Sequence, residues 1–389
     1  MKKCPNCGKQ RLIKNGRHFR GSIVTQEYKC NFCGKYTSEP IVVPDIDVEE
    51  KQKALDINRI YRKRKRKEAR ESYSTKDYSE CIIDLLERMK PEPKNFDFIK
   101  SNDKDRNPIG IIHISDSHFL SKIDTGGNKF NFEIASKRMM KLYLEATEYF
   151  ETLGVINVLI AITGDMIDLE NHMDKKIGNS HNRAVGTVLA FQILSKFMLD
   201  LSVNYNVSCA CVIGNEGRIT EKNVWKKDVA TNNYDWMLFN MLALYLDGIV
   251  RFKKSNVLED VVKVGDMNIL LLHGHSISGN GKIEKTIQEI IGKYAMNGKI
   301  IHYVLFAHKH TANISDFFAR GASLCGNDSY AHNALHLNGK ASQNVFIIKG
   351  NKTIDSIRID LQNVEDIIGY QLQESFLEEF EVSFDEEVL

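Results

Sequence analysis

The distribution of apolar and polar residues changes along the chain. From residue 108 onward, short apolar runs alternate with longer stretches in which apolar residues recur every three or four positions. This alternation predicts strands connected by amphipathic helices, and the strand-rich later part predicts a second sheet, so we expect an α/β domain. The predicted strands are 109–114, 155–163, 208–213, 269–272, 302–306 and 345–348, and the predicted helices are 131–150, 183–203, 234–246 and 282–294.

The pattern before residue 108 is different. A strand-like run at 22–28 lies between two Cys-x-x-Cys turns, and residues 49–90 are amphipathic at helical spacing, with a run of six Lys and Arg residues at 62–67. Prolines and a polar linker follow. We therefore divide the chain into a small metal-stapled unit at 1–40, a basic helical segment and linker at 41–107, an α/β domain at 108–362 and an acidic tail at 363–389.

The composition is that of a globular protein. Of the 389 residues, 42% are hydrophobic and 27% are charged, which excludes a wholly disordered or fibrous chain. No apolar run approaches the roughly 20 residues of a membrane-spanning helix, and residues 1–5 lead into no secretory signal. We expect a soluble protein of a bacterial or phage-infected cytoplasm, where the eight cysteines are thiols or metal ligands.

Charge is distributed unevenly along the sequence. Residues 1–107 hold 26 Lys and Arg against 17 Asp and Glu, a surplus of +9, and the net charge of +2 leaves −7 for the remainder. Residues 364–389 hold nine acidic and no basic residues. We expect this end to be a solvated tail; the alternatives are docking to a partner and mimicry of DNA.

Four cysteines predict a structural zinc site near the start of the chain. Cys4 and Cys7 form one Cys-x-x-Cys turn, Cys30 and Cys33 form another, and each turn is followed by Gly and Lys. Four thiolates close a tetrahedral shell and leave no open position for chemistry. A pair of redox sites is the alternative, but neither turn lies in a β-α-β context.

This cysteine-rich stretch resembles the zinc ribbons at the front of many bacterial transposases and other DNA-handling proteins. Up to Cys33 it carries eight Lys and Arg residues and the single acid Glu27. A cationic ribbon suits contact with phosphates, so we expect binding to nucleic acid, most simply DNA. The alternative is a ribbon that contacts only protein.

Five short motifs follow predicted strands in the α/β domain. They are Asp116-Ser117-His118, Gly164-Asp165, Gly214-Asn215-Glu216, His273-Gly274-His275 and His308-Lys309-His310. Two divalent cations roughly 3.5–4 Å apart need a bridging carboxylate, and imidazoles and small oxygen donors complete each shell. Ligands at the carboxyl ends of strands gather on one edge of a sheet, so these motifs predict a two-metal site suited to manganese, iron or zinc.

In this order the motifs resemble the calcineurin-like metallophosphoesterase superfamily, over about residues 108–360. The resemblance implies a two-sheet αββα sandwich and a metal-dependent phosphoric ester hydrolase. It also implies that a hydroxide between two metals attacks phosphorus. The implied ligands are Asp116, His118 and His310 for one metal and Asn215, His273 and His308 for the other, with Asp165 bridging.

The chain departs from the family pattern at two positions. Glu216 stands where the family commonly has the histidine that assists the leaving group, and Ala307 replaces the glycine before His308. Two adjacent cations favour ionised Glu216, which weakens it as a proton donor. Arg218 is a candidate for neutralising phosphate charge, with a surface role as the alternative, and His275 is a second choice to His273 as a ligand.

The sequence is compatible with more than one class of substrate. Residues 318–335 resemble phosphoesterases encoded by tailed bacteriophages, often labelled SbcD-like DNA repair nucleases. With the basic ribbon, this resemblance leads us to expect a phosphodiesterase or nuclease acting on DNA or RNA. The alternatives are a phosphatase or nucleotide hydrolase, and a non-catalytic DNA-binding protein that keeps the metals. A protein partner such as an ATPase subunit is compatible with a nuclease. The sequence indicates no oligomeric state.

Overall fold

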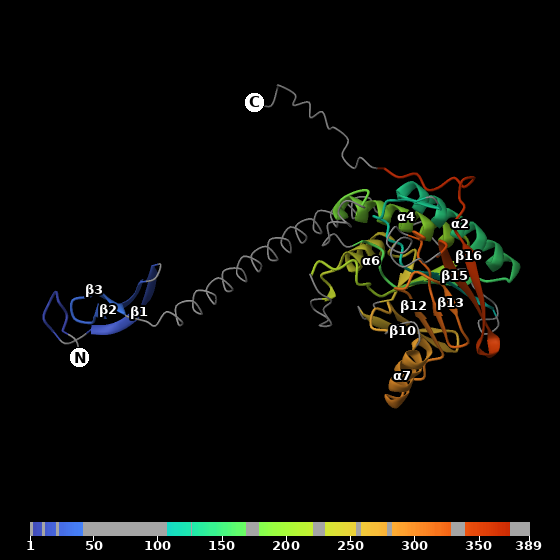
Figure 1. The fold of residues 1–389 in the computed structure, drawn as a ribbon. Helices are drawn as coiled ribbons and strands as arrows, with labels where there is room; N and C mark the ends of the chain where they lie inside the picture. The colour runs from blue at the N-terminus through green and yellow to red at the C-terminus, as the bar shows by residue number, and fades with distance from the viewer. Residues whose placement is uncertain are drawn as a thin grey trace, which may run out of the picture. The chain divides into compact units, whose positions relative to one another are not determined.

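The chain divides into two compact units, residues 1–74 and 75–389. A computed structural model describes residues 3–9, 12–20, 23–41, 107–125, 127–168, 179–220, 230–253, 258–277, 282–327 and 339–373 (Figure 1). The predicted basic helical segment at 41–107, apart from its two end residues, and the acidic residues of the tail beyond 373 lie outside these described residues.

The described part of the first unit is a three-stranded antiparallel sheet with two matching turns, one before the first strand and one between the second and third strands. Its strands β1 (Leu12–Arg20), β2 (Ile23–Cys30) and β3 (Tyr36–Ile41) pair in that order. In each turn the glycine after the second cysteine adopts a positive φ and donates its N–H to the first cysteine's carbonyl oxygen, at 2.9 Å for both Gly8 and Gly34. The described residues between 3 and 41 therefore form a small ribbon of the kind predicted, although the sequence did not predict β1 and β3.

Six strands form the first sheet of the second unit's described part. Their order is β16-β15-β4-β7-β8-β9, with β4, β7, β8 and β9 parallel and β15 antiparallel to both β4 and β16. The sequence predicts β4 to the residue and misses β9 and β16. The bounds are β4 Ile109–Ile114, β7 Asn157–Ile162, β8 Asn206–Cys211, β9 Arg251–Phe252, β15 Ser342–Lys349 and β16 Thr353–Asp360.

A second sheet has the order β10-β11-β12-β14-β13. Strands β11, β12 and β14 are parallel, so β11 and β12 end at the same edge. A separate hairpin pairs β5 with β6. The bounds are β10 Glu259–Val264, β11 Met267–Leu272, β12 Tyr303–Phe306, β13 Asn313–Ile314, β14 Phe318–Arg320, β5 Ile123–Thr125 and β6 Asn128–Phe130, with a 3-10 turn η1 at Gly350–Lys352.

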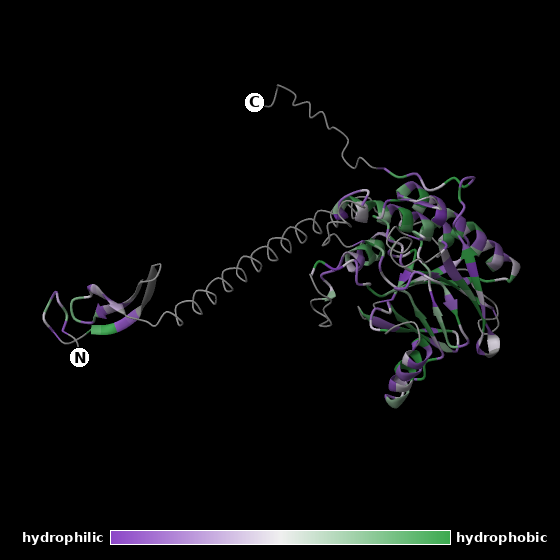
Figure 2. Cartoon of the chain, in the orientation of Figure 1, coloured by the Kyte–Doolittle hydropathy of each residue, from purple (hydrophilic) through white to green (hydrophobic). Residues whose placement is uncertain are grey.

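The four helices predicted after residue 108 all form, within two residues of the expected ends. Helices α2, α4 and α6 each begin after an asparagine whose side-chain oxygen accepts a backbone N–H, the usual way to satisfy the first turn. Helix α7 is amphipathic, with hydrophobic and hydrophilic residues alternating around it (Figure 2). The bounds are α2 Phe132–Thr152, α4 Arg183–Asn204, α6 Tyr234–Tyr245 and α7 Ile283–Met296.

Three apolar clusters separate four layers. One packs α2, α4 and α6 against the six-stranded sheet, and it includes Leu142, Leu194 and Leu242. A second fills the space between the two sheets, and a third lies between the five-stranded sheet and α7, around Ile287. The fold is thus the predicted αββα two-sheet sandwich.

Helix α4 corrects one expectation from the sequence. Among the described residues it alone is long and apolar enough to pass for a membrane-spanning helix. Of its most apolar 18-residue window, 61% is buried inside the fold. The apolar residues of α4 therefore have a place in the core of the sandwich.

Candidate metal centres

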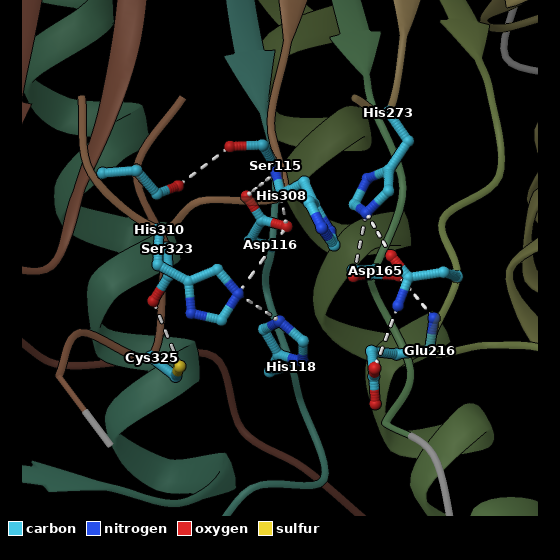
Figure 3. A network of polar contacts seen from close by, with 12 residues as sticks. Ser115, Asp116, His118, Asp165, Glu216, His273, His308, His310, Ser323 and Cys325 are labelled. Atoms are coloured by element: carbon cyan, nitrogen blue, oxygen red, sulfur yellow. Dashed lines mark hydrogen bonds and ion pairs between the residues drawn. The ribbon is translucent and has the colours of Figure 1, made fainter. Parts of the chain in front are cut away.

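The topology brings the five predicted motifs together. The Asp116, Asp165 and Asn215 motifs follow the neighbouring parallel strands β4, β7 and β8, while His273 and His308 follow β11 and β12. Because parallel strands end at the same edge, these side chains meet at one rim of the sandwich (Figure 3).

The first group consists of Asp116, His118 and His310. The His118 and His310 rings face each other with 3.1 Å between their Nε2 atoms, and His310 Nε2 is 3.9 Å from Asp116 Oδ1 (Figure 3). Two ligands about 2.0–2.1 Å from one ion lie roughly 2.9–3.4 Å apart. The distance from His310 to Asp116 is longer than this range, and the distance between the two histidines suits a shared cation. The same spacing suits an N–H···N hydrogen bond when one ring is protonated.

The second group consists of Asp165, His273 and His308. His273 Nε2 lies 3.0 Å from Asp165 Oδ2 and 3.0 Å from Asn215 Oδ1. The His273 and His308 ring centroids are 5.1 Å apart. The predicted ligands Asn215, His273 and His308 are therefore gathered beside Asp165, whose bridging role stays a prediction.

Two histidines are fixed through the nitrogen that faces away from the site. His118 Nδ1 is 2.9 Å from Asp168 Oδ1, and His273 Nδ1 is 2.7 Å from the carbonyl oxygen of Thr163. An acceptor at Nδ1 keeps the proton there and directs the Nε2 lone pair outward. Histidine ligands of metals are oriented in this way.

The backbone of the candidate ligands is strained. Six described non-glycine residues have positive φ, and five of these are predicted ligands. Each such residue costs about 1–3 kcal/mol, and such strain clusters at functional sites. The fold therefore supports an unfavourable backbone where ligation needs it. The five are Asp116 (φ 43), His118 (φ 46), Asp165 (φ 54), His308 (φ 76) and His310 (φ 53).

Glycines and one buried carboxylate clamp the Asp165 and Asn215 loops together. A Cβ on Gly214 would lie 2.0 Å from Asp165 Oδ1, and one on Gly164 would lie 2.2 Å from the Gly214 nitrogen, so neither position admits a side chain. Asp235 at the start of α6 accepts the backbone N–H groups of residues 165, 166, 167 and 214 at 2.9–3.1 Å.

Asp165 and His273 stabilise each other's charged forms. Burial raises the pKa of Asp165, but His273 and His118 outweigh this and hold that pKa well below its usual value. Burial lowers the pKa of His273, but the charge of Asp165 outweighs it and raises that pKa to about 9. Without a cation, protons compensate the carboxylate charge, and cation binding would displace them because a ligating imidazole is neutral.

Both groups have the donor chemistry that divalent metals need. Each combines a buried carboxylate with two imidazoles, and the donor atoms within each group lie within 4.8 Å of one another. Carboxylate with imidazole suits manganese, iron or zinc. The residues present therefore fit two divalent cations.

Glu216 and Arg218 hold the Asn215 loop. Glu216 donates its backbone N–H to Asp165 Oδ1 at 2.7 Å, and its Oε1 accepts a hydrogen bond from Asn215 Nδ2 at 2.9 Å. Because a carboxylate only accepts, this bond turns the Asn215 oxygen toward His273. Arg218 donates from Nη1 to the Asn215 carbonyl oxygen. His275 lies farther off, its ring centroid 6.3 Å from that of His308.

Sequence reasoning missed three residues that support the site. Asp168 follows Asp165 by three positions, a spacing that signals little by itself. Asp235 looks like an ordinary acid at a helix start. Arg183, buried at the start of α4, donates to the carbonyl oxygens of residues 168, 216 and 218 at 2.8–3.0 Å. Asp168 contacts His118, which is distant in sequence, while Asp235 and Arg183 reach the loops from the starts of α6 and α4.

The four cysteines of the ribbon form a third group. Cys4 Sγ lies 3.7 Å from Cys33 Sγ, and Cys7 Sγ lies 3.7 Å from Cys30 Sγ. Ligands about 2.3 Å from a tetrahedral zinc are roughly 3.8 Å apart. A backbone hydrogen bond from Lys35 lowers the pKa of the Cys33 thiol to about 6. A backbone hydrogen bond from Lys9 lowers the pKa of Cys7, but desolvation and the neighbouring cysteines outweigh it and raise that pKa to about 11, so zinc binding would displace protons from the group. The group fits a structural zinc.

Comparisons with known proteins give weak likenesses. No family model and no curated protein match the sequence. A conserved uncharacterized protein from Streptococcus pneumoniae, described as a predicted phosphoesterase, is 13% identical, with a TM-score of 0.29 and coverage of 68% of this chain and 93% of that chain. A single mutant of Vps29 from Entamoeba histolytica is 12% identical, with a TM-score of 0.28 and coverage of 64% and 98%. A hypothetical protein from Pyrococcus horikoshii is 10% identical, with a TM-score of 0.34 and coverage of 65% and 88%.

We expect Cys30→Ser to remove one zinc per chain and to unfold the ribbon, because the remaining three thiolates leave the shell incomplete. Elemental analysis and near-ultraviolet circular dichroism measure both effects. Cys325→Ser, outside the ribbon, is the control. An unchanged zinc content in Cys30→Ser would contradict the assignment.

We expect Asp168→Asn to weaken cation binding by about 10–100-fold, because the amide lacks the charge that makes His118 a stronger ligand. Titration of the metal-free chain with Mn²⁺, followed by electron paramagnetic resonance, measures the affinity. Asp124→Asn, at an exposed position on β5, should change nothing. Equal affinities for the two variants would show that Asp168 does not support the site.

Proposed function

We propose that the second unit is a binuclear-metal phosphoesterase that cleaves phosphodiester bonds in nucleic acid, most simply DNA. The observation that carries the proposal is the pair of carboxylate–imidazole groups at one rim, built on left-handed backbone. In a structural metal site, protein ligands fill every coordination position of one ion. Two adjacent ions that keep open coordination positions suit catalysis on a charged phosphate ester.

The residues of the chain would have separate roles in this reaction. Bound at the two groups, divalent cations would lower the pKa of a water molecule and stabilise negative charge on phosphoryl oxygens. Asp116 and Asp165 supply the buried negative charge that retains the cations, and Asp168 and Thr163 direct the imidazoles of His118 and His273. A phosphate-neutralising role for Arg218 belongs to this proposal.

The ribbon supports a polynucleotide substrate. The side chains described in it include five lysines and two glutamates, so the ribbon attracts phosphate. A nuclease of this kind works in the cytoplasm, and an ATPase subunit that opens DNA is a fitting partner. The alternatives are a phosphatase and a non-catalytic binding protein. A comparison of cleavage across several phosphate esters separates them from a nuclease.

We expect the full chain with Mn²⁺ to cleave labelled DNA and bis(p-nitrophenyl) phosphate, and we expect Asp165→Asn to abolish both reactions. The substrates to compare are single-stranded DNA, duplex DNA, RNA, cyclic nucleotides and a phosphopeptide. Cleavage of monoesters alone would establish the phosphatase. Binding of DNA without hydrolysis under any divalent metal would establish the non-catalytic protein.

We expect Glu216→Gln to keep the metal content and to retain the rate within about threefold, because the glutamine oxygen can accept the same bond from Asn215. The measurement is kcat for DNA and for bis(p-nitrophenyl) phosphate, with Glu216→Ala as the variant that frees the Asn215 amide. If Glu216 instead protonates the leaving group, Glu216→Gln should lose roughly 10²–10⁴-fold in rate on DNA.

A further inference from the structure

The ribbon exposes aromatic rings that its own fold does not use. Tyr36 is 56% exposed at the start of β3, and Phe32 is 55% exposed in the second cysteine turn. Rings of this size that are more than half exposed are available for contact with another molecule.

Each ring has a lysine beside it. Lys9 Nζ lies 3.7 Å from the centroid of the Phe32 ring, and Lys29 Nζ lies 5.5 Å from the centroid of the Tyr36 ring. Both distances are within the range of a cation–π contact. A lysine covers only one face of a ring, and both rings are more than half exposed.

The strand register places one of these pairs in a row across the sheet. Ile13 is opposite Lys29 on β2, and Lys29 is opposite Tyr36 on β3. Residues directly opposite each other in antiparallel strands share one face of the sheet. This face therefore presents a half-exposed Ile13, a lysine and an open tyrosine ring.

Charge decides which kind of molecule fits. The described side chains of the ribbon include the acids Glu27 and Glu39, and Glu27 already accepts a hydrogen bond from Asn15. The lysines beside the exposed rings disfavour an apolar protein surface, which would bury their charge. A polyanion that also carries flat rings satisfies both the lysines and the aromatic side chains.

We infer that the ribbon is a stacking platform for unpaired bases, in which Phe32 and Tyr36 stack on bases while Lys9 and Lys29 contact phosphates. Paired bases hide their faces within a duplex, whereas unpaired bases stack on aromatic side chains. The inference rests on the proposed nucleic-acid substrate and refines it to single-stranded segments.

The test measures binding separately from cleavage. Full-length Asp165→Asn protein, which we expect to be inactive, is titrated into labelled oligothymidylate and into a duplex of equal length at fixed salt, with fluorescence anisotropy as the readout. In this background, Phe32→Leu with Tyr36→Leu removes the rings but keeps apolar bulk. Ile13→Ala is the matched control, since Ile13 lies in the same row without a ring.

We expect the double substitution to weaken oligothymidylate binding about tenfold or more and to change duplex binding less than twofold. Lys29→Ala should reduce the salt dependence of single-strand binding by about 0.7 in the log–log slope. Retention of one zinc per chain shows that each variant has a folded ribbon.

Three results would overturn the inference. They are unchanged oligothymidylate binding by the zinc-loaded double variant, equal losses for single strand and duplex, and a preference of the chain for an acidic peptide over oligothymidylate. Cleavage of bis(p-nitrophenyl) phosphate separates the two proposals. If the natural chain cleaves this diester but loss of the rings leaves binding unchanged, only the stacking platform is wrong. If the chain binds single strands through the rings but cleaves no diester, only the proposed function is wrong.

Discussion

The structure and chemistry of the candidate metal centres depend on two buried aspartates at the ends of neighbouring strands. Asp116 and Asp165 are 0% and 1% exposed. Burial is the largest cause that raises the pKa of Asp116, to about 7, and the charge of Asp165 acts in the same direction. Negative charge in such a place needs compensation by protons or metal ions. The surrounding histidines supply sites for either, so the chemistry of the site follows from where the charge is buried.

The fold keeps this arrangement by joining loops that are distant in sequence. Asp116 accepts the backbone N–H of His308, which ties the first sheet to the second, and Asp235 ties the Asp165 loop to the Asn215 loop. Arg183 holds the same loops through three carbonyl oxygens. Rigid support of this kind is what permits left-handed backbone at the candidate ligands.

The sequence predicts the elements better than it predicts the contacts. Strand β4 is found because a short continuous apolar run indicates a buried strand, and helix α2 because its apolar residues recur at helical spacing. The ligand motifs are found because they follow strands. Asp168 and Asp235 are missed because their importance comes from neighbours brought near by folding. Glu216 shows the limit most clearly: its bond to Asn215 gives it a positioning role that a comparison of motifs does not suggest. The short strands β9 and β13 have no periodic signal.

Anomalous diffraction from a crystal of the full chain grown with Mn²⁺ tests the central claim most directly. The account predicts two manganese peaks roughly 3.5–4 Å apart, one beside Asp116, His118 and His310 and the other beside His273 and His308, with Asp165 between them. No peak at this rim, with His118 and His310 hydrogen-bonded to each other instead, would contradict it.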